Sequence, residues 1–282
     1  MTSAEEFLRS YHDARPEAAS ELAERGRVVG DGRSVYEVFA DRVVAAKGNT
    51  DTNTEAKPQA VLDLGCGDGA LLAALKTRGV AKVAGLDLSP GQLAAARKRP
   101  ELGEADLKEG RAQKLPFADN EFDTVVSFMA LMLMADVEQV VAEVARVLAP
   151  GGTLAIGVGG GGREAMEVFL KVARPLFAVV PQERRVPVAG DPRTRTREGL
   201  DQLLTPKGFE PVGWERIVVD FGGTPDEVWQ TCHDSYYQMV TLDETHKKGL
   251  RTAFTVATRN LVTAEGRLAA SACIDVAVTR LR

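Results

Sequence analysis

The stretch VLDLGCGDG, residues 61–69, decides the fold of this 282-residue chain. Its apolar first half has the length of a buried strand, and leucines follow at helical spacing in residues 70–77. Gly65 and Gly67 let the backbone turn tightly and approach a ligand closely, because no Cβ is in the way. A strand, a glycine loop and a helix in this order are typical of an open parallel sheet, whose ligands bind at the carboxyl ends of the strands.

The alternation of strands and helices continues beyond this loop. Ser89 and Pro90 mark the start of the next helix, as its N-cap and its first residue. Alternating units of this kind predict an α/β fold with a doubly wound, mostly parallel sheet that has helices on both faces. The expected parallel strands are 60–64, 82–86, 106–109, 122–128 and 153–158.

Two later stretches complete the predicted sheet. Residues 209–221 and 267–281 have strand patterns and are separated by helices, which predicts an antiparallel edge. The four glycines at 159–162 are expected to form a hinge before a helical lid. We expect one structural domain with three parts: a helical N-terminal cap at 1–55 that ends in a polar linker at 48–54, a cofactor-binding core at 56–160, and the completion of the sheet with helical lid insertions at 161–282.

Composition and charge exclude several classes of protein. The hydrophobic fraction of 44% is close to the globular average and excludes global disorder. The formal net charge of −5 argues against a nucleic-acid or anionic-membrane partner, since such partners need basic surfaces. The most apolar stretch, 125–135, is too short to cross a bilayer, and the polar N-terminus lacks a signal-peptide pattern.

Cysteine usage indicates a reducing compartment. Cys66, Cys232 and Cys273 are far apart and odd in number, which fits neither a disulfide framework nor zinc-ligand spacing. We therefore expect a cytoplasmic protein without a metal, as a monomer or a homodimer.

Two carboxylates distinguish the glycine loop from a dinucleotide site. Asp63, just before the glycines, can accept hydrogen bonds from a cationic amine but would repel a pyrophosphate. Asp87, at the end of the second strand, suits two ribose hydroxyls, a need that a nicotinamide cofactor shares. An NAD(P)-dependent oxidoreductase is thus an alternative, opposed by Asp63 and by the Pro-Gly-Gly segment at 150–152.

Four motifs follow one another in a recognisable order. They are VLDLGCGDG at 61–69, GLDLS at 85–89, KLPFADNEFDTVVS at 114–127 and VLAPGGTL at 147–154. Together they resemble the class I S-adenosylmethionine-dependent methyltransferases, in particular the small-molecule, ubiquinone-biosynthesis-type (methyltransferase-11-like) enzymes. The resemblance implies a Rossmann-like seven-stranded sheet with one antiparallel edge strand, and S-adenosyl-L-methionine as cofactor.

The resemblance also implies the cofactor-binding residues. Asp63, with the glycines, would hold the methionine portion, and Asp87 the ribose. Tyr11, His12 and Tyr36 of the cap are expected to close over the cofactor. The full set comprises Tyr11, Tyr36, Asp63, Leu64, Gly65, Cys66, Gly67, Asp87, Leu88 on the adenine, Ala112 and Gln113 at the adenine edge, and Ser127, Phe128 and Met129 beside the sulfonium.

Two positions depart from the family pattern. The residue before Ala112 is often acidic and accepts from the adenine amine, whereas here it is Arg111, which cannot accept a hydrogen bond. Relatives often carry histidines after the fourth strand, where this chain has Met132 and Leu133. No acid or base can be assigned from that segment.

The segment 232–237 holds the densest set of titratable and aromatic side chains outside the core. If it is helical, His233 and Tyr237 share a face and line a substrate pocket, with His233 as base; the alternative is an amphipathic helix with partly buried aromatics. We expect methyl transfer from S-adenosylmethionine to an O or N atom of a small-molecule acceptor, a secondary metabolite. The non-enzyme alternative is a methyltransferase-like binding protein without turnover.

Overall fold

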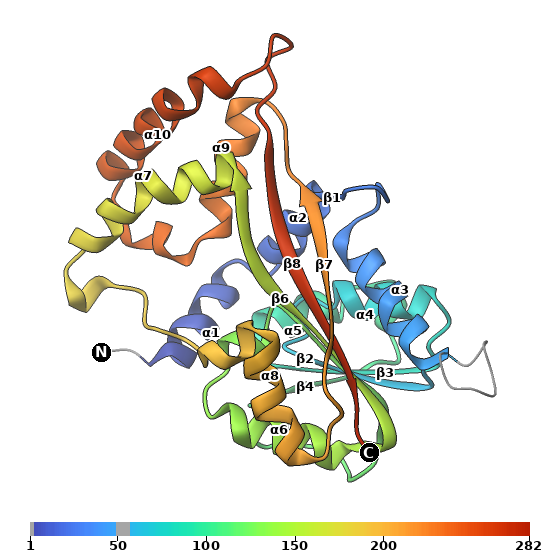
Figure 1. The fold of residues 1–282 in the computed structure, drawn as a ribbon. Coiled ribbons are helices and arrows are strands. Elements are labelled where there is room, and N and C mark those ends of the chain that lie inside the picture. The colour runs from blue at the N-terminus through green and yellow to red at the C-terminus, as the bar shows by residue number, and fades with distance from the viewer. Residues whose placement is uncertain (1–2, 49–56) are drawn as a thin grey trace.

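The computed structural model describes residues 3–48 and 57–282, which form one eight-stranded sheet with helices around it (Figure 1). The strand order is β1-β7-β8-β6-β5-β2-β3-β4. The strands are β1 (Arg27–Val28), β2 (Ala60–Leu64), β3 (Lys82–Asp87), β4 (Asp106–Glu109), β5 (Phe122–Phe128), β6 (Leu148–Glu164), β7 (Gly213–Asp220) and β8 (Ala270–Arg280). The α-helices are α1 (Ala4–Ala14), α2 (Ala18–Arg25), α3 (Val35–Gly48), α4 (Ala70–Thr77), α5 (Pro90–Ala96), α6 (Val137–Val147), α7 (Ala165–Val179), α8 (Arg197–Leu204), α9 (Pro225–Ser235) and α10 (Glu244–Thr258).

Five neighbouring strands form the parallel part of the sheet. β4, β3, β2, β5 and β6 pair in parallel, in the positions that the apolar runs predict. Val61 and Leu62 point to opposite faces of β2 and are both completely buried, because helices cover both faces. The predicted Rossmann-like, doubly wound α/β fold is confirmed.

The other part of the sheet is antiparallel, as predicted, but it has one more strand than expected. β8 lies inside the sheet and runs against both of its neighbours, β6 and β7. The predicted count of seven strands is wrong because Arg27–Val28 pairs antiparallel with β7 and becomes the outermost strand. A pairing of two residues carries no strand periodicity, and it depends on a close approach at Gly26, where a Cβ would lie 2.6 Å from the Phe221 ring.

The tetraglycine at 159–162 lies within β6, so the predicted hinge is wrong. β6 pairs with β8 as far as Glu164, with a register shift between Gly159 and Gly161. A Cβ at Gly160 would lie 2.8 Å from the Asp275 carboxylate of β8. Glycine in a strand often marks such a close approach. From the sequence alone, four consecutive glycines instead predict the end of a strand.

Helices pack on the two faces of the sheet with separate apolar layers. On one face, Val35, Phe39 and Val43 of α3 are buried, as their four-residue spacing predicts. Complete burial of a side chain such as Phe39 contributes about 1.5–3 kcal/mol. On the other face, α6 buries Val137, Val140, Val141, Val144 and Val147.

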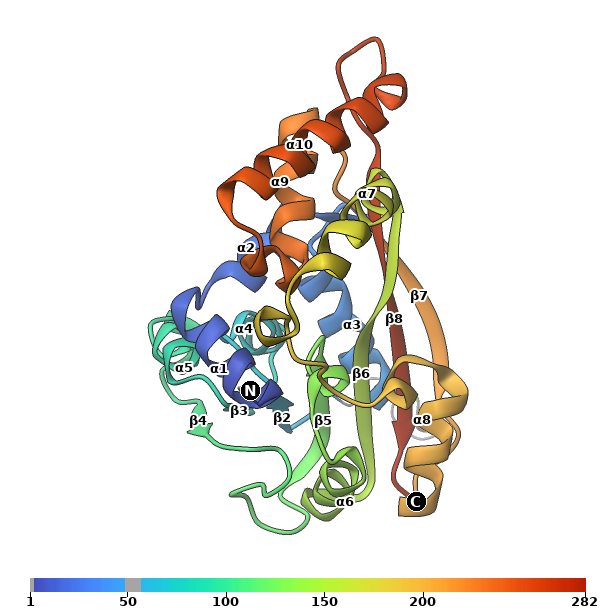
Figure 2. The same cartoon turned by 90° about the vertical axis from the view of Figure 1, so that its left-hand side faces the viewer.

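Three helices form a lid where β6, β7 and β8 extend past the other strands (Figure 1). Phe169 of α7 packs against Trp229 of α9, with ring centroids 5.8 Å apart, and against Phe254 of α10, at 6.0 Å. The lid helices α7, α9 and α10 thus share a small core of their own. Figure 2 shows α1 and α2 between this lid and the edge of the sheet that β2, β3 and β4 form.

The predicted linker at 48–54 lies outside the described residues, apart from Gly48 at the end of α3. The boundary between residues 55 and 56 lies outside them as well, so the division into cap, core and lid stays a prediction. Among the helices of residues 3–48 and 57–282, none is long and apolar enough to span a membrane.

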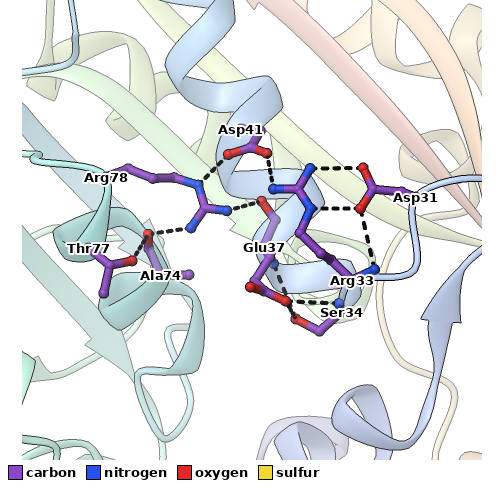
Figure 3. A network of polar contacts seen from close by, with 8 residues as sticks. All are labelled: Asp31, Arg33, Ser34, Glu37, Asp41, Ala74, Thr77 and Arg78. Carbon is purple, nitrogen blue, oxygen red and sulfur yellow. Dashed lines mark hydrogen bonds and ion pairs between the residues drawn. The ribbon is translucent and has the colours of Figure 1, made fainter.

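A network of charged side chains joins α3 to α4 (Figure 3). The guanidinium of Arg78, directly after α4, pairs with Asp41 of α3. It also donates to the carbonyl oxygens of Glu37 and Ala74, each at 2.8 Å. Asp41 pairs in turn with Arg33, which is more exposed than Arg78 (44% against 18%). Arg78 is therefore the member that fixes α3 on the core.

We expect Arg78→Met to lower the free energy of unfolding by about 1–3 kcal/mol, because it removes a partly buried charge pair with Asp41 and two hydrogen bonds to carbonyl oxygens. Urea denaturation measures the change. The control is Arg33→Met, which removes the more exposed pairs with Asp31 and Asp41 and should change the free energy of unfolding by less than about 1 kcal/mol. Equal losses in the two variants would contradict the role given to Arg78.

Candidate active site

A cavity of about 460 Å³ lies at the carboxyl ends of β2, β3 and β5, between the cap helices and the lid. The glycine loop after β2 forms part of its wall. Gly65 and Gly67 have φ values of 73° and 56°, and a Cβ at Gly65 would overlap with that of Ala130. Gly65 is therefore required for both its conformation and the space around it.

Asp63 is the most unusual polar residue of the cavity. It lies at the end of β2 and is 2% exposed, and its Oδ1 has no hydrogen-bond partner among the described residues. Burial, with the nearby charge of Asp87, raises the pKa of Asp63 to about 8. A buried carboxylate without a partner is costly, so this oxygen suits a ligand that brings a donor or a positive charge.

Asp87, at the end of β3, has donors for both of its oxygens. Oδ2 accepts from the Gly67 amide at 2.9 Å, and Oδ1 accepts from the Ser89 amide at 2.9 Å. Burial nevertheless raises its pKa, against the effect of these hydrogen bonds. Each carboxylate oxygen can accept a second hydrogen bond, so Asp87 can still bind a pair of ligand hydroxyls.

Twelve of the predicted cofactor residues line this one cavity. They are Tyr11, Tyr36, Asp63, Gly65, Cys66, Gly67, Asp87, Leu88, Ala112, Gln113, Phe128 and Met129. Burial raises the pKa of the Cys66 thiol, so this side chain is a loop filler and not a nucleophile.

Two predicted cofactor residues do not line the cavity. Leu64 points into the core and is 1% exposed. Ser127 is completely buried; its hydroxyl donates to the Leu64 carbonyl and accepts from the Leu131 amide, both at 3.0 Å. Ser127 therefore ties β2 to the turn after β5.

The cap contributes a histidine to the cavity. His12 of α1 places Nε2 3.0 Å from the Tyr237 hydroxyl and Nδ1 3.2 Å from the Gln92 amide nitrogen, and all three residues line the cavity. Burial lowers the pKa of His12, which keeps its ring neutral at pH 7. Burial also raises the pKa of Tyr237, so its hydroxyl keeps its proton.

His233 is placed away from Tyr237, so the predicted shared helical face is wrong. α9 ends at Ser235, and Tyr237 follows in a short 3₁₀ helix. Tyr237 lines the cavity, whereas the His233 ring pairs with Asp234 at 3.1 Å and does not line it. Asp234 also pairs with Arg25 of the cap at 2.7 Å, so this end of α9 connects lid and cap.

Sequence patterns do not identify several residues of the cavity, because the contacts that place these residues there join distant parts of the chain. Examples are Glu5, Gln92 and Asp234, which the fold brings to the cavity wall. A capping box of Ser3 and Glu6 marks the start of α1, but no local pattern says where α1 docks. Met132 and Leu133, in place of histidines, line the cavity and supply no acid or base.

Comparison with known proteins places this arrangement in a family. Residues 62–156 match the family model described as a methyltransferase domain. A demethylmenaquinone methyltransferase from Corynebacterium kroppenstedtii is 30% identical over 188 residues, which cover 60% of this chain and 76% of that protein. The chain belongs to the class I S-adenosylmethionine-dependent methyltransferases. The resemblance seen in the sequence motifs is thereby confirmed, and the oxidoreductase alternative is set aside.

Other relatives match over a shorter part of this chain. A demethylmenaquinone methyltransferase from Thermus thermophilus is 39% identical over 109 residues, or 38% of this chain. The matched segment spans about half the length of that relative (50%).

Solved structures share the fold. The [4+2]-cyclase SpnF is similar with a TM-score of 0.59 at 18% identity, over 99% of this chain and 96% of that one. The YcgJ protein from Bacillus subtilis has a TM-score of 0.55 at 17% identity, over 88% of this chain and 97% of that one.

In the ligand-free methyltransferase, we expect Asp63 to make stability fall as the pH rises. Its pKa of about 8 in the folded state exceeds the ordinary aspartate value of about 4 in the unfolded state. Between these values the folded state binds more protons, so the free energy of unfolding falls by up to about 1.4 kcal/mol per pH unit. Urea denaturation from pH 5 to pH 8 measures the slope.

The matched control is Asp63→Asn, which cannot titrate and should show a flatter dependence over the same pH range. The same slope in both proteins would show that Asp63 is ionised in the free protein.

Proposed function

We propose that this protein transfers a methyl group from S-adenosylmethionine to an O or N atom of a small-molecule acceptor with an apolar body, a secondary metabolite of quinone-like character. One observation carries the proposal: a single cavity has the buried Asp63 and the half-buried Asp87 at one end, and mainly apolar side chains beneath the lid at the other. Several relatives are named demethylmenaquinone methyltransferases, which supports an acceptor of this kind.

The carboxylate end would hold the cofactor, whose sulfonium supplies an activated methyl group. Asp63 has a free buried oxygen for the ammonium of the methionine portion. Asp87 would accept from the ribose hydroxyls while its other contacts hold the glycine loop. Leu88 and Ala112 would pack beside the adenine.

The lid end would hold the acceptor. Its wall is mainly apolar, with Met166, Val219, Phe221, Tyr236, Ala272 and Ile274. Tyr236 is fixed by stacking on Phe169 of α7, with centroids 5.3 Å apart and planes 11° apart. Such a wall excludes water and aligns the nucleophile with the methyl carbon; alignment alone is worth about 7–11 kcal/mol in favourable cases.

His12 and Tyr237 would handle the proton of an acceptor that arrives protonated. The new bond forms between the acceptor atom and the methyl carbon while the carbon–sulfur bond breaks, so one proton must leave the acceptor. With the Gln92 side-chain amide turned so that its oxygen accepts from Nδ1–H, His12 is free to accept at Nε2 from the Tyr237 hydroxyl. Tyr237 can then accept the proton of the acceptor while its own passes to His12. His233, outside the cavity, takes no part in this scheme.

Cellular setting and partners belong to the same proposal. We propose a cytoplasmic monomer or homodimer, and the net charge of −5 argues against a nucleic-acid partner. Among residues 3–48 and 57–282, no cluster of three or more metal-ligating side chains occurs.

Asp87→Ala should weaken binding of S-adenosylmethionine by about 10–100-fold, because charged hydrogen-bond acceptors for the ribose are lost. Isothermal titration calorimetry gives the affinity. Asp106→Ala, which removes a partly exposed carboxylate paired with Lys108 on β4, is the control and should bind normally. Unchanged affinity in Asp87→Ala would contradict the cofactor assignment.

Tyr237→Phe and His12→Gln should each lower kcat by about 10²–10⁴-fold, the usual contribution of a positioned acid or base. Affinity for S-adenosylmethionine should stay within about threefold. Mass spectrometry of methylated products from a panel of phenols and quinols measures turnover. Full activity in both variants would show that the acceptor loses its proton elsewhere, and cofactor binding without any product across the panel would favour the binding-protein alternative.

A further inference from the structure

Arg111 holds a distant carboxylate at the adenine edge of the cavity. Its Nε lies 2.9 Å from Oε2 of Glu5, and its second terminal nitrogen lies 2.9 Å from Oε1. Glu5 belongs to the first turn of α1, 106 positions away in the chain. At position 111, where relatives often have an acidic residue, the arginine thus binds an acidic side chain that comes from another element.

Gln113 fixes the same carboxylate from a second side. Its amide nitrogen lies 3.2 Å from Oε1 of Glu5 and 2.7 Å from the carbonyl oxygen of Ala135. Glu5, Arg111 and Gln113 all line the cavity, and the Glu5 side chain is 25% exposed. The carboxylate is therefore oriented, mostly covered and at the cavity wall.

The hydrogen-bond capacity of Glu5 is not used up by these contacts. A carboxylate has about four acceptor positions. Oε1 accepts from Arg111 and from Gln113, whereas Oε2 has only the Arg111 contact. One position remains on Oε2 for a donor from a ligand.

We propose that Glu5 binds the exocyclic amino group of the cofactor's adenine and selects adenine over 6-oxo purines. This inference rests on the proposed function, since it assumes that the nucleoside binds along Ala112 and Gln113. An amino group would donate to Oε2, whereas the carbonyl oxygen of hypoxanthine would meet a carboxylate and lose its own hydrogen bond. Charged hydrogen bonds discriminate strongly for this reason.

Contacts other than those of Glu5 also hold α1 on the core. Asp13, near the end of the helix, accepts from the Ser89 hydroxyl at 2.5 Å and from the Gly91 amide at 2.9 Å. Arg9 pairs with Glu109 at 3.0 Å. Removal of the Glu5 carboxylate should therefore leave the cap in place, so that selection and docking can be tested separately.

The experiment compares two ligands that differ only at the purine. Dissociation constants of S-adenosylhomocysteine and S-inosylhomocysteine are measured by calorimetry on the full chain, for wild type, Glu5→Ala, Glu5→Gln and Glu109→Gln. Wild type should bind the adenosyl ligand at least about tenfold more tightly. In Glu5→Ala this ratio should fall to about threefold or less, and Glu109→Gln, which removes only the partner of Arg9, should keep the wild-type ratio.

The ratio separates selection from a purely structural role. A Glu5→Ala variant that binds both ligands more weakly by the same factor would overturn the inference and leave Glu5 as a docking contact. If Glu5→Ala does not fold, Glu5→Gln decides, because it keeps the volume and loses the charge: its ratio should fall by at least about threefold, and an unchanged ratio overturns the inference. Absence of adenosyl-ligand binding in wild type would instead overturn the proposed function.

Discussion

Two carboxylates at neighbouring strand ends, Asp63 buried and Asp87 half-buried, are the constraint on which the site depends. They lie where β2 and β3 end, and the charge of Asp87 adds to the cost of ionising the buried Asp63. Asp87 is stabilised by two backbone amides, whereas Asp63 keeps one oxygen without a partner. A bound cation would supply the hydrogen-bond partner that Oδ1 of Asp63 lacks, so the site favours a ligand that carries an amine.

The cap and the lid close over these carboxylates from different parts of the chain. Asp13 fixes α1 on the start of α5, and Asp234 of the lid pairs with Arg25 of α2. The Asp234 carboxylate in this pair is 6% exposed, and Tyr237, after α9, packs edge-on against Tyr11 of α1 with ring centroids 4.8 Å apart. Cap and lid are thus joined by a buried carboxylate and by an aromatic contact at the cavity.

The sequence predicts the core of this protein far better than its cavity roof. Local patterns are sufficient for β2, α4 and α5, because glycine conformation, helix capping and apolar periodicity are properties of neighbouring residues. The tetraglycine and Arg27–Val28 are misread, since their strand pairing depends on partners in β8 and β7. His12 and Glu5 lie on an ordinary amphipathic helix, and only the docking of this helix brings them to Tyr237 and Arg111. His233 and Tyr237 do not share the predicted face because α9 ends at Ser235, two residues before Tyr237.

The shared fold does not by itself determine the reaction, which depends on the cap and lid residues that cover the cavity. A protein named as a [4+2]-cyclase has the same overall fold at 18% identity, so the sheet and glycine loop alone do not determine what happens to an acceptor. In this chain the acid–base chemistry available near the apolar chamber comes from α1 and from the segment after α9, where His12 meets Tyr237. These two side chains lie on different elements, α1 of the cap and the 3₁₀ turn after α9, so their contact depends on how the cap docks against the lid. Under the proposed function, the pair that moves the proton is therefore also part of the wall that excludes water from the acceptor.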